Sequence, residues 1–374
     1  MRILFVATEA SGEFLGAQLL RALRSRGIPV SADGIVGKKL LELGVRPLAE
    51  GSALNVMGFV DTVLQLHRLY QYFRAVAAAL REQPPDLAIL IDQSGFNLRI
   101  AALARKHLVP VLFVVSPQIW ASRAGRLRKI LSVVDHMIVL YPFEVEIYRA
   151  TSLPVTMMTH PLVSLMREAP AKAQACQMLR LSDDQVIFVM MPGSRDGEIK
   201  AHAPELAKIA KRLASMFTDA SFIVPLAREE QVGLFKALWR HGCEGPPEPL
   251  VRVGNAQTMI AAADLAIVAS GTATLQVALT GRPAVVIYRT HLLSYALAKR
   301  LVRVRHIALP NILLGKTVYP EFIQERLRTE PICATIADIM ADRGRQQLAE
   351  LAKLGPMLEG ATDEEIVNVV LGLA

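Results

Sequence analysis

The stretch best suited to bind a ligand is the turn Pro192–Arg195, which follows the apolar run Val186–Met191. The run has the composition of a buried parallel strand, and the polar sequence after the turn favours a helix. Gly193 lets backbone N–H groups approach a ligand closely, and the N-terminus of the helix favours an anion. Arg195 adds a planar cation suited to phosphate oxygens. The turn, Ser194 included, predicts a diphosphate site, although an ordinary strand-to-helix turn explains the same pattern.

A second turn of this kind follows the apolar run Leu265–Ala269. Gly271 again allows close approach of the backbone, Ser270 and Thr272 supply hydroxyl groups, and a helix N-terminus comes next. We therefore expect both turns to contribute to one anion-binding site.

The N-terminal half places acidic residues at the ends of predicted strands. Asp92 follows the strand Leu87–Ile91, and the turn Glu9–Gly12 follows the strand Arg2–Ala7. Enzymes with parallel sheets put working groups at the carboxyl ends of strands. Asp92, Glu9 and Ser11 are equally suited to cap the helices that follow. The turn lacks the full G-x-G-x-x-G pattern, which argues against a dinucleotide site.

These elements predict an α/β fold with two Rossmann-like domains, 1–163 and 164–374, facing a cleft. Residues 163–185 have the weak pattern of a connector, and we leave open whether the C-terminal helices pack back on the first domain or on a partner subunit. Further strands are expected at Val111–Val115, His136–Leu140, Ser221–Leu226 and Ala284–Tyr288.

Composition points to an anionic partner. The 374 residues carry a net charge of +8, which suits phospholipid, nucleic acid or a phosphorylated substrate. The segment 55–83 predicts an amphipathic helix with basic residues beside its apolar face, explained either by packing on the sheet or by dipping into a bilayer. Basic clusters at 123–129 and 299–306 leave RNA binding as a weak alternative. No signal peptide or spanning segment is recognisable, so we expect a cytoplasmic protein.

Together the motifs resemble the lipid-A-disaccharide synthase family, glycosyltransferases of the GT-B type, over nearly the whole chain. The motifs that carry the resemblance are Glu9–Gly12, Val56–Gly58, Ile91–Asp92 with Phe96–Asn97, Val115–Pro117 with Trp120, Pro142–Glu144, His160–Pro161, Pro192–Arg195, Val224–Leu226, Ser270–Thr272, Tyr288–Arg289 and Leu309–Asn311.

The resemblance implies transfer of 2,3-diacylglucosamine from its UDP ester to the 6-hydroxyl of 2,3-diacylglucosamine 1-phosphate. The β(1→6) linkage forms with inversion, and UDP leaves. No metal or other cofactor is expected, and the enzyme acts as a peripheral protein on the inner face of the inner membrane. The resemblance also implies exchange of C-terminal segments between subunits, and therefore a homodimer.

Residue roles follow from the same resemblance. Asp92 is the expected general base, and Arg195 is expected to stabilise the departing diphosphate. The backbone around Gly193 and Ser194, together with Ser270, Gly271 and Thr272, is expected to complete the donor site, with Gln276 at the ribose. The residues expected to line the substrate side are Glu9, Ser11, Gly12 and Asn311.

Three positions depart from the family pattern. Gly95 replaces an Asp, Thr159 replaces a Gly, and Gln276 replaces a Glu. Gln276 can still hydrogen-bond to the ribose hydroxyls but loses the charge-assisted part of that bond, about 1 kcal/mol. These changes keep alternatives open: a paralogue with another donor or acceptor, another UDP-sugar enzyme of the same architecture, or a catalytically weak protein that binds lipid or nucleotide at a membrane surface.

Overall fold

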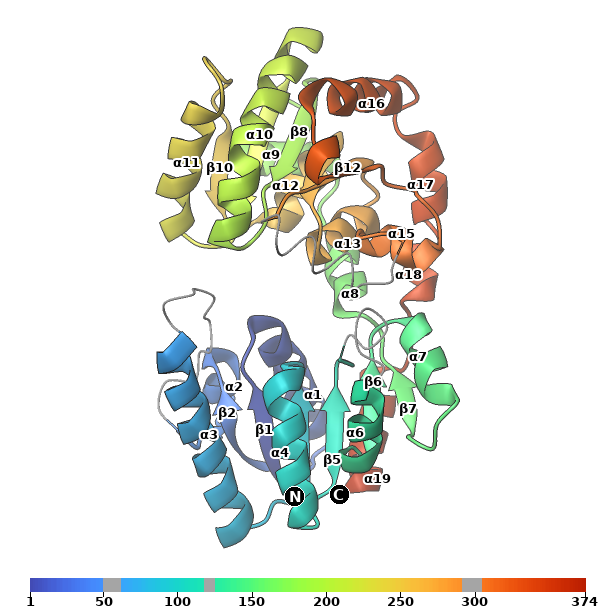
Figure 1. Cartoon of the computed structure of the whole chain (residues 1–374). Coiled ribbons are helices and arrows are strands. Elements are labelled where there is room, and N and C mark those ends of the chain that lie inside the picture. The colour runs from blue at the N-terminus through green and yellow to red at the C-terminus, as the bar shows by residue number, and fades with distance from the viewer. Residues whose placement is uncertain (50–61, 118–124, 291–304) are drawn as a thin grey trace. The chain divides into compact units, whose positions relative to one another are not determined.

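The computed structural model describes residues 1–49, 62–117, 125–290 and 305–374. The chain divides into one unit of Met1–Pro161 with Leu358–Ala374 and a second unit of Leu162–Met357. Each unit has a parallel sheet with helices on both faces (Figure 1), so the predicted α/β class with two Rossmann-like domains is confirmed. The motif Val56–Gly58, Trp120 and most of the 299–306 cluster lie outside the described residues.

Among the described residues, the first unit holds a seven-stranded sheet of order β3-β2-β1-β4-β5-β6-β7. Its strands are β1 Arg2–Ala7, β2 Ser31–Val36, β3 Arg46–Pro47, β4 Leu87–Ile91, β5 Val111–Val114, β6 His136–Val139 and β7 Val155–Met157. Its helices are α1 Ala10–Ser25, α2 Lys38–Glu42, α3 Thr62–Glu82, α4 Ser94–Lys106, α6 Gly125–Val133, α7 Pro142–Arg149 and α19 Asp363–Leu373.

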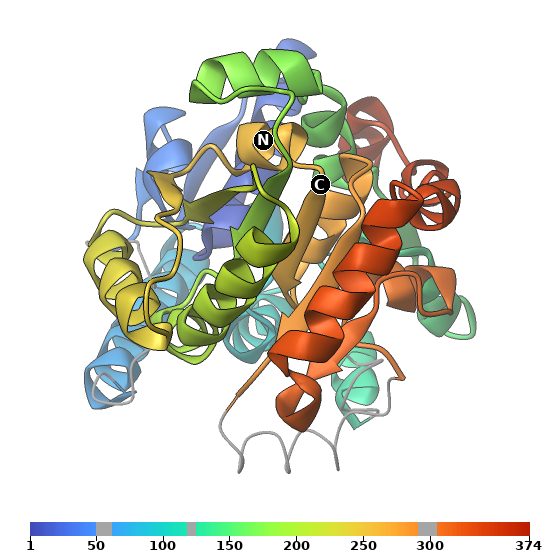
Figure 2. The same cartoon turned by 90° about the horizontal axis from the view of Figure 1, so that it is seen from above.

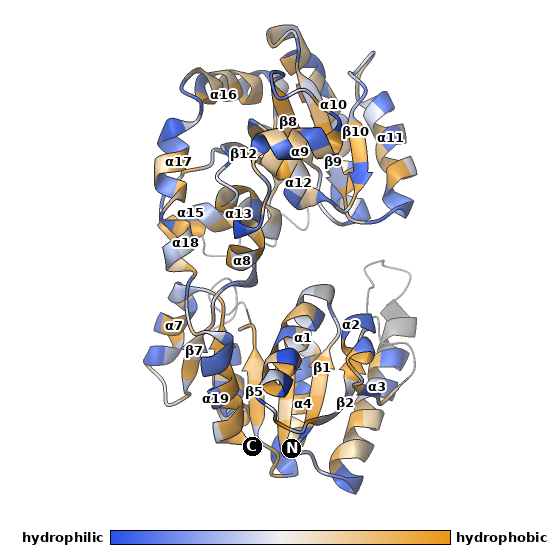
Figure 3. Cartoon of the chain, turned by 180° about the vertical axis from the view of Figure 1, so that it is seen from behind, coloured by the Kyte–Doolittle hydropathy of each residue, from blue (hydrophilic) through white to orange (hydrophobic). Residues whose placement is uncertain are grey.

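Two apolar layers enclose this first sheet. Helices α3, α4 and α6 cover one face, where Tyr72, Val76 and Ile100 are buried. Helices α1, α2 and α19 lie on the other face (Figure 3), where Leu20 and Val367 join the core. The central strands are buried on both sides, which explains why they read as continuous apolar runs in the sequence.

Strand β2 was not predicted because its sequence, SADGIV, contains an acidic residue and a glycine. Asp33 is held by the guanidinium groups of Arg2 and Arg46, each at 2.7 Å. Gly34 lies so close to β1 that a Cβ would stand 2.2 Å from the carbonyl oxygen of Phe5. These are tertiary causes, which local sequence periodicity does not show.

The described part of the second unit holds a six-stranded sheet of order β10-β9-β8-β11-β12-β13. Its strands are β8 Ile187–Met191, β9 Ser221–Leu226, β10 Leu250–Val253, β11 Leu265–Ala269, β12 Ala284–Tyr288 and β13 Glu321–Ile323. Its helices are α8 Pro161–Arg167, α9 Lys172–Leu179, α10 Asp196–Met216, α11 Glu230–Gly242, α12 Ala256–Ala262, α13 Thr272–Leu279, α15 Leu309–Leu314, α16 Thr329–Ala341, α17 Arg345–Leu351 and α18 Leu354–Met357.

Helices α10, α11 and α16 pack together over one face of this second sheet (Figure 2). Helix α9 packs against α12 and buries Ala175, Cys176 and Leu179, so the interpretation of 163–185 as a connector is wrong for its helical part. The apolar spacing of this short helix is too brief to stand out in the sequence.

The last helix, α19, belongs to the first unit. Gln18 of α1 donates to Asp363 at 2.8 Å, and Arg26 donates to Asn368 at 2.6 Å. Gly360 approaches β7 so closely that a Cβ would lie 2.4 Å from the carbonyl oxygen of Met157. The chain therefore returns to the first unit after completing the second.

Candidate active site

Asp92 lies at the carboxyl end of β4, the centre of the first sheet. Its backbone has φ +56°, and its Oδ1 accepts the N–H of Gln93 at 2.8 Å. Asn97 donates to the carbonyl oxygens of Ile91 and Asp92 at 3.0 and 2.8 Å, which holds this unusual backbone in place. Burial raises the pKa of Asp92, as does the nearby carboxylate of Glu9. A carboxylate with a raised pKa accepts a proton more readily.

Glu9 lies beside Asp92 because β1 and β4 are neighbouring parallel strands. Its Oε1 accepts the side-chain amide of Gln93 at 3.0 Å, so Gln93 connects the two acidic turns. Ser11 is exposed in the first turn of α1, and Glu9, the N-cap residue of this helix, makes no side-chain capping hydrogen bond. Gly12 serves helix packing, because a Cβ would lie 3.3 Å from the side chain of Ile91.

Two further strands end in titratable groups at the same edge of this sheet. Glu144 is buried after β6, where its Oε2 accepts the N–H groups of Leu140 and Tyr141 at 3.2 Å each. Burial raises the pKa of Glu144 to about 7 and lowers the pKa of His160, which follows β7, to about 4. Burial raises the pKa of Tyr141, as do the carboxylates of Glu144 and Asp92. The Tyr141 hydroxyl is therefore close enough to both carboxylates to feel their charge.

The turn Pro192–Arg195 lies between β8 and the long helix α10, as predicted from the sequence. Gly193 has φ +109°, a conformation that favours glycine. Glu198 on the first turn of α10 accepts the N–H groups of Ser194 and Arg195 at 3.0 and 3.2 Å. A Cβ at position 193 would lie 2.4 Å from the Glu198 carboxylate. The position of the Glu198 side chain therefore requires a glycine at position 193, whether or not a ligand is bound.

The N–H groups expected to hold a diphosphate are thus engaged by Glu198, an interaction that the sequence analysis missed. The signal for it was the E three residues after the helix N-cap, the spacing of a capping box. The Arg195 guanidinium contacts Glu198 at 3.4 Å, with its side chain 60% exposed. Arg195 is therefore available to an anionic ligand.

The turn after β11 lies beside the turn after β8, because these two strands are neighbours in the sheet. Gly271 and Thr272 are exposed, and Gln276 is half-buried one turn into α13. The hydroxyl of Ser270 donates to the carbonyl oxygen of Ile307 at 2.8 Å. Gly271 and Thr272 are thus the members of this predicted group that are accessible to a ligand.

Asn311 does not reach the surface of the protein. It is fully buried, and its Oδ1 accepts the N–H groups of Val318 and Tyr319 at 2.9 and 2.8 Å. Its Nδ2 donates to the carbonyl oxygen of Tyr319 and to Glu321 at 2.7 and 2.8 Å. All four hydrogen-bonding positions of the amide are used. This arrangement corrects the prediction of substrate contact: Asn311 organises the loop before β13.

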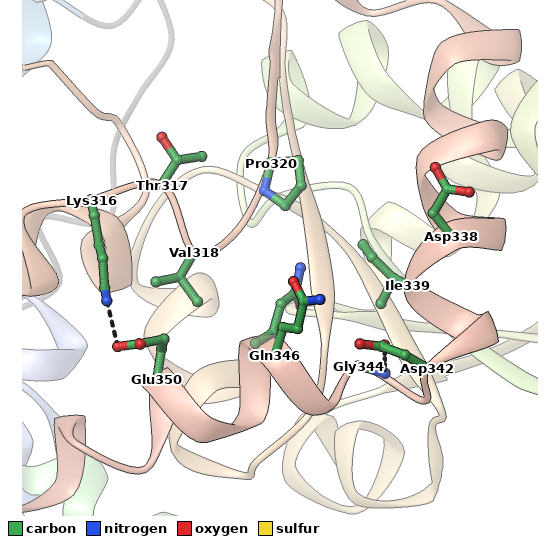
Figure 4. Close-up of a pocket in the computed structure, with 11 residues that line it drawn as sticks. Lys316, Thr317, Val318, Pro320, Asp338, Ile339, Asp342, Gly344, Gln346 and Glu350 are labelled. Atoms are coloured by element: carbon green, nitrogen blue, oxygen red, sulfur yellow. Dashed lines mark hydrogen bonds and ion pairs between the residues drawn. The ribbon is translucent and has the colours of Figure 1, made fainter.

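A cavity of about 490 Å³ in the second unit is lined by residues 316–350 (Figure 4), and none of the turn residues described above lines it. Its wall includes the ion pair of Lys316 with Glu350 at 2.7 Å, and Gln347. Gln347 binds the backbone of Ala284, which begins β12. Ligands of open parallel sheets bind at the carboxyl ends of strands, and this cavity lies at the opposite end.

The face of the first sheet that carries α3, α4 and α6 is strongly basic. The sequences of these helices contain a single acidic residue, Glu82. Tyr70 on α3 is 60% exposed, and Leu108 just after α4 is 91% exposed. The basic residues on this face are Arg68, Arg74, Arg81, Arg99, Arg105, Lys106, Arg126, Arg128 and Lys129. None of the described helices is long and apolar enough to cross a membrane.

Two Rossmann-like units, each with a parallel sheet, define the GT-B fold. MurG from Acinetobacter baumannii has this fold, with 13% identity, a TM-score of 0.58, and coverage of 99% of each chain. The UDP complex of MnaA from S. aureus has a TM-score of 0.64 at 11% identity, covering 100% of this chain and 97% of that chain.

Sequence comparison specifies the family. Residues 3–356 match the model of the lipid-A-disaccharide synthetase family. The lipid-A-disaccharide synthase of Trichlorobacter lovleyi is 37% identical over 378 residues, covering 100% of this chain and 97% of that protein. The Alkalilimnicola ehrlichii enzyme of the same name is 37% identical, covering 100% and 99%. The chain belongs to the lipid-A-disaccharide synthase family and is a glycosyltransferase of lipid A synthesis.

Proposed function

We propose that the chain transfers 2,3-diacylglucosamine from its UDP ester to the 6-hydroxyl of 2,3-diacylglucosamine 1-phosphate, with inversion. The observation that carries this proposal is the half-buried, proton-attracting carboxylate of Asp92 at the carboxyl end of a central strand, in a chain that belongs to this family. The first unit would hold the acceptor, with Glu9 and Ser11 beside Asp92. The second unit would hold UDP.

Asp92 takes the proton from the acceptor hydroxyl as its oxygen forms a bond to the anomeric carbon. The bond from that carbon to the UDP oxygen breaks on the opposite face, which inverts the configuration. The accessible guanidinium of Arg195 neutralises charge on the departing diphosphate, an effect worth about 3 kcal/mol by analogy with oxyanion-hole donors. Gly271 and Thr272 supply further donors from the neighbouring turn, and Gln276 contacts the ribose.

The reaction is tested by incubating the purified chain with both acylated substrates and detecting the disaccharide by mass spectrometry. Asp92→Asn keeps the shape of the side chain and removes the base. Loss of a general base is expected to lower kcat about 10²–10⁴-fold, while UDP still raises the Tm. An Asp92→Asn variant with the wild-type rate would show that another group accepts the proton.

Arg195→Ala is expected to lower kcat by about 100-fold or more, because the guanidinium acts on charge that develops during the reaction. Two other outcomes decide between the alternatives. UDP stabilisation without product from these substrates supports a paralogue of different specificity or a weak binding protein. Absence of UDP stabilisation overturns the assignment of the second unit.

We further propose that the basic face formed by α3, α4 and α6 holds the enzyme at the anionic cytoplasmic surface of the inner membrane. Each Lys or Arg near such a surface contributes about 1 kcal/mol. Replacing Arg74, Arg128 and Lys129 by serine is therefore expected to lower the affinity for anionic vesicles about 100-fold at low salt, as measured by co-sedimentation.

The matched control replaces Arg21, Lys38 and Lys39, which are exposed on the opposite face of the same sheet. Equal loss of vesicle binding by both triple variants would show that net charge, rather than this face, drives binding. The predicted homodimer is tested separately, by light scattering on the purified chain.

A further inference from the structure

His202 is a fully buried histidine on α10, behind the turn Pro192–Arg195. Its Nδ1 lies 2.7 Å from the carbonyl oxygen of Pro192, the first residue of that turn. Its Nε2 lies 2.9 Å from the backbone nitrogen of Arg289, the residue that follows β12. Neither the family motifs nor the proposed chemistry uses this side chain.

The two partners fix the protonation state of the ring. A carbonyl oxygen only accepts and a backbone N–H only donates, so Nδ1 must carry the proton and Nε2 must accept. A protonated ring would direct an N–H at the N–H of Arg289. Burial lowers the pKa of His202, and this favours the same neutral form.

The connection spans two strands that do not touch each other. In the sheet, β11 lies between β8 and β12, so no backbone hydrogen bond of the sheet joins β8 to β12. The segments that follow these two strands can therefore be connected only through side chains. Arg289 is also bound to α10, since its guanidinium lies 2.8 Å from the carboxylate of Glu205. The ring of Tyr288 lies 5.7 Å from the imidazole. Helix α10 therefore holds the exit of β12 against the turn that follows β8.

We propose that His202, as the Nδ1–H tautomer, is a positioning residue that fixes the Pro192–Arg195 turn relative to the Tyr288–Arg289 segment. The expected effect on UDP binding rests on the proposed function of the second unit. The hydrogen bonds of His202 to Pro192 and Arg289 do not depend on that function. His202 acts through the backbone, and the side chain that reaches the diphosphate is that of Arg195.

The test compares His202→Leu with Gln347→Leu. Gln347 is also buried in the second unit, and its amide makes two hydrogen bonds to Ala284 at the start of the same strand β12, at 2.8 and 3.1 Å. Each variant removes two hydrogen bonds of a buried side chain, so both are expected to lower the Tm. His202→Leu removes one bond at Pro192 and one at Arg289, after β12, whereas Gln347→Leu removes both at Ala284. Only His202→Leu is expected to speed amide hydrogen exchange at Arg289, by about tenfold.

Side-chain nitrogen shifts from NMR at pH 7 provide the second measurement, and no ligand is needed. A protonated Nδ1 and an unprotonated Nε2 are expected for His202. The Nε2–H tautomer, or equal exchange at Arg289 in both leucine variants, would overturn the proposal.

UDP affinity then measures the consequence for the site. His202→Leu is expected to raise the Kd for UDP about tenfold, and Gln347→Leu to leave it within about twofold. His202→Asn, which keeps a donor near Pro192, is expected to recover part of the affinity. An unchanged Kd in His202→Leu overturns the positioning role. A wild-type chain that binds no UDP refutes the proposed function, while the exchange and NMR results still decide whether His202 connects the two segments.

Discussion

Replacing Glu144 by glutamine should stabilise the first unit in a way that depends on pH. Glu144 is 3% exposed, and its pKa is raised from 4.5 to about 7 by burial. In the unfolded chain the carboxyl group ionises near 4.5, whereas in the folded chain it stays protonated until about pH 7. The unfolded state is therefore favoured progressively as the pH rises between these values.

The magnitude follows from the difference of about 2.5 pKa units, which corresponds to about 3 kcal/mol lost by the wild-type protein above pH 7. Glutamine does not ionise, and its amide oxygen can still accept the N–H groups of Leu140 and Tyr141. These hydrogen bonds are already included in the shifted pKa, and the protonated carboxyl and the amide are both neutral acceptors, so the full difference of about 3 kcal/mol is expected at pH 8. A stabilisation of about 3 kcal/mol should raise the Tm of this unit by about 6–12 °C.

The assay is thermal unfolding of wild type and Glu144→Gln at pH 4.5 and pH 8, with Glu146→Gln as the control. Glu146 lies on the same helix, with its side chain 63% exposed. The two variants should behave alike at pH 4.5, and only Glu144→Gln should gain stability at pH 8. Equal Tm differences at the two pH values would show that Glu144 is ionised normally and would refute the reasoning.

Three other substitutions test the environments described above. Asn311→Ala leaves several buried polar groups unpaired and should lower the free energy of unfolding of the second unit by about 3–5 kcal/mol, measured with denaturant. A stable variant with weakened substrate binding would instead support direct contact between Asn311 and the substrate. Glu198→Ala removes the cap on Ser194 and Arg195 and should cost about 1–2 kcal/mol, so unchanged stability would contradict the capping role. Gly95→Asp has open space around its Cβ and should add about 1 kcal/mol to the stability of α4; an unchanged rate and specificity would show that Gly95 is not the source of functional divergence.

The sequence predicted the central strands well because burial on both faces makes them continuous apolar runs. β1, β4, β9, β11 and β12 have the bounds expected for them. The strands that were missed are those held by particular tertiary contacts or placed towards the sheet edges, such as β2, β10 and β13. Local periodicity carries little of that information.

The candidate site shows the same division. Asp92 and the Pro192–Arg195 turn lie after buried strands as expected, because strand ends and turns have recognisable local patterns, while their roles stay predictions. Glu198 and His202 were missed because their importance comes from which backbone groups they reach after folding. Asn311 was placed on the substrate because a motif shows that a residue matters without showing whether it serves binding or structure.

The return of the chain to the first unit bears on how the protein is made. Ile366, Val367 and Val370 fill the α1 side of the first core, so that core lacks these side chains until the segment after Met357 has been synthesised. The ribosome must first make all of Leu162–Met357, which takes roughly 10–40 s at about 5–20 residues per second. During this interval the nascent first unit presents an uncovered apolar stripe, where a chaperone can bind. The uninterrupted second unit can finish folding before the unit that begins the chain.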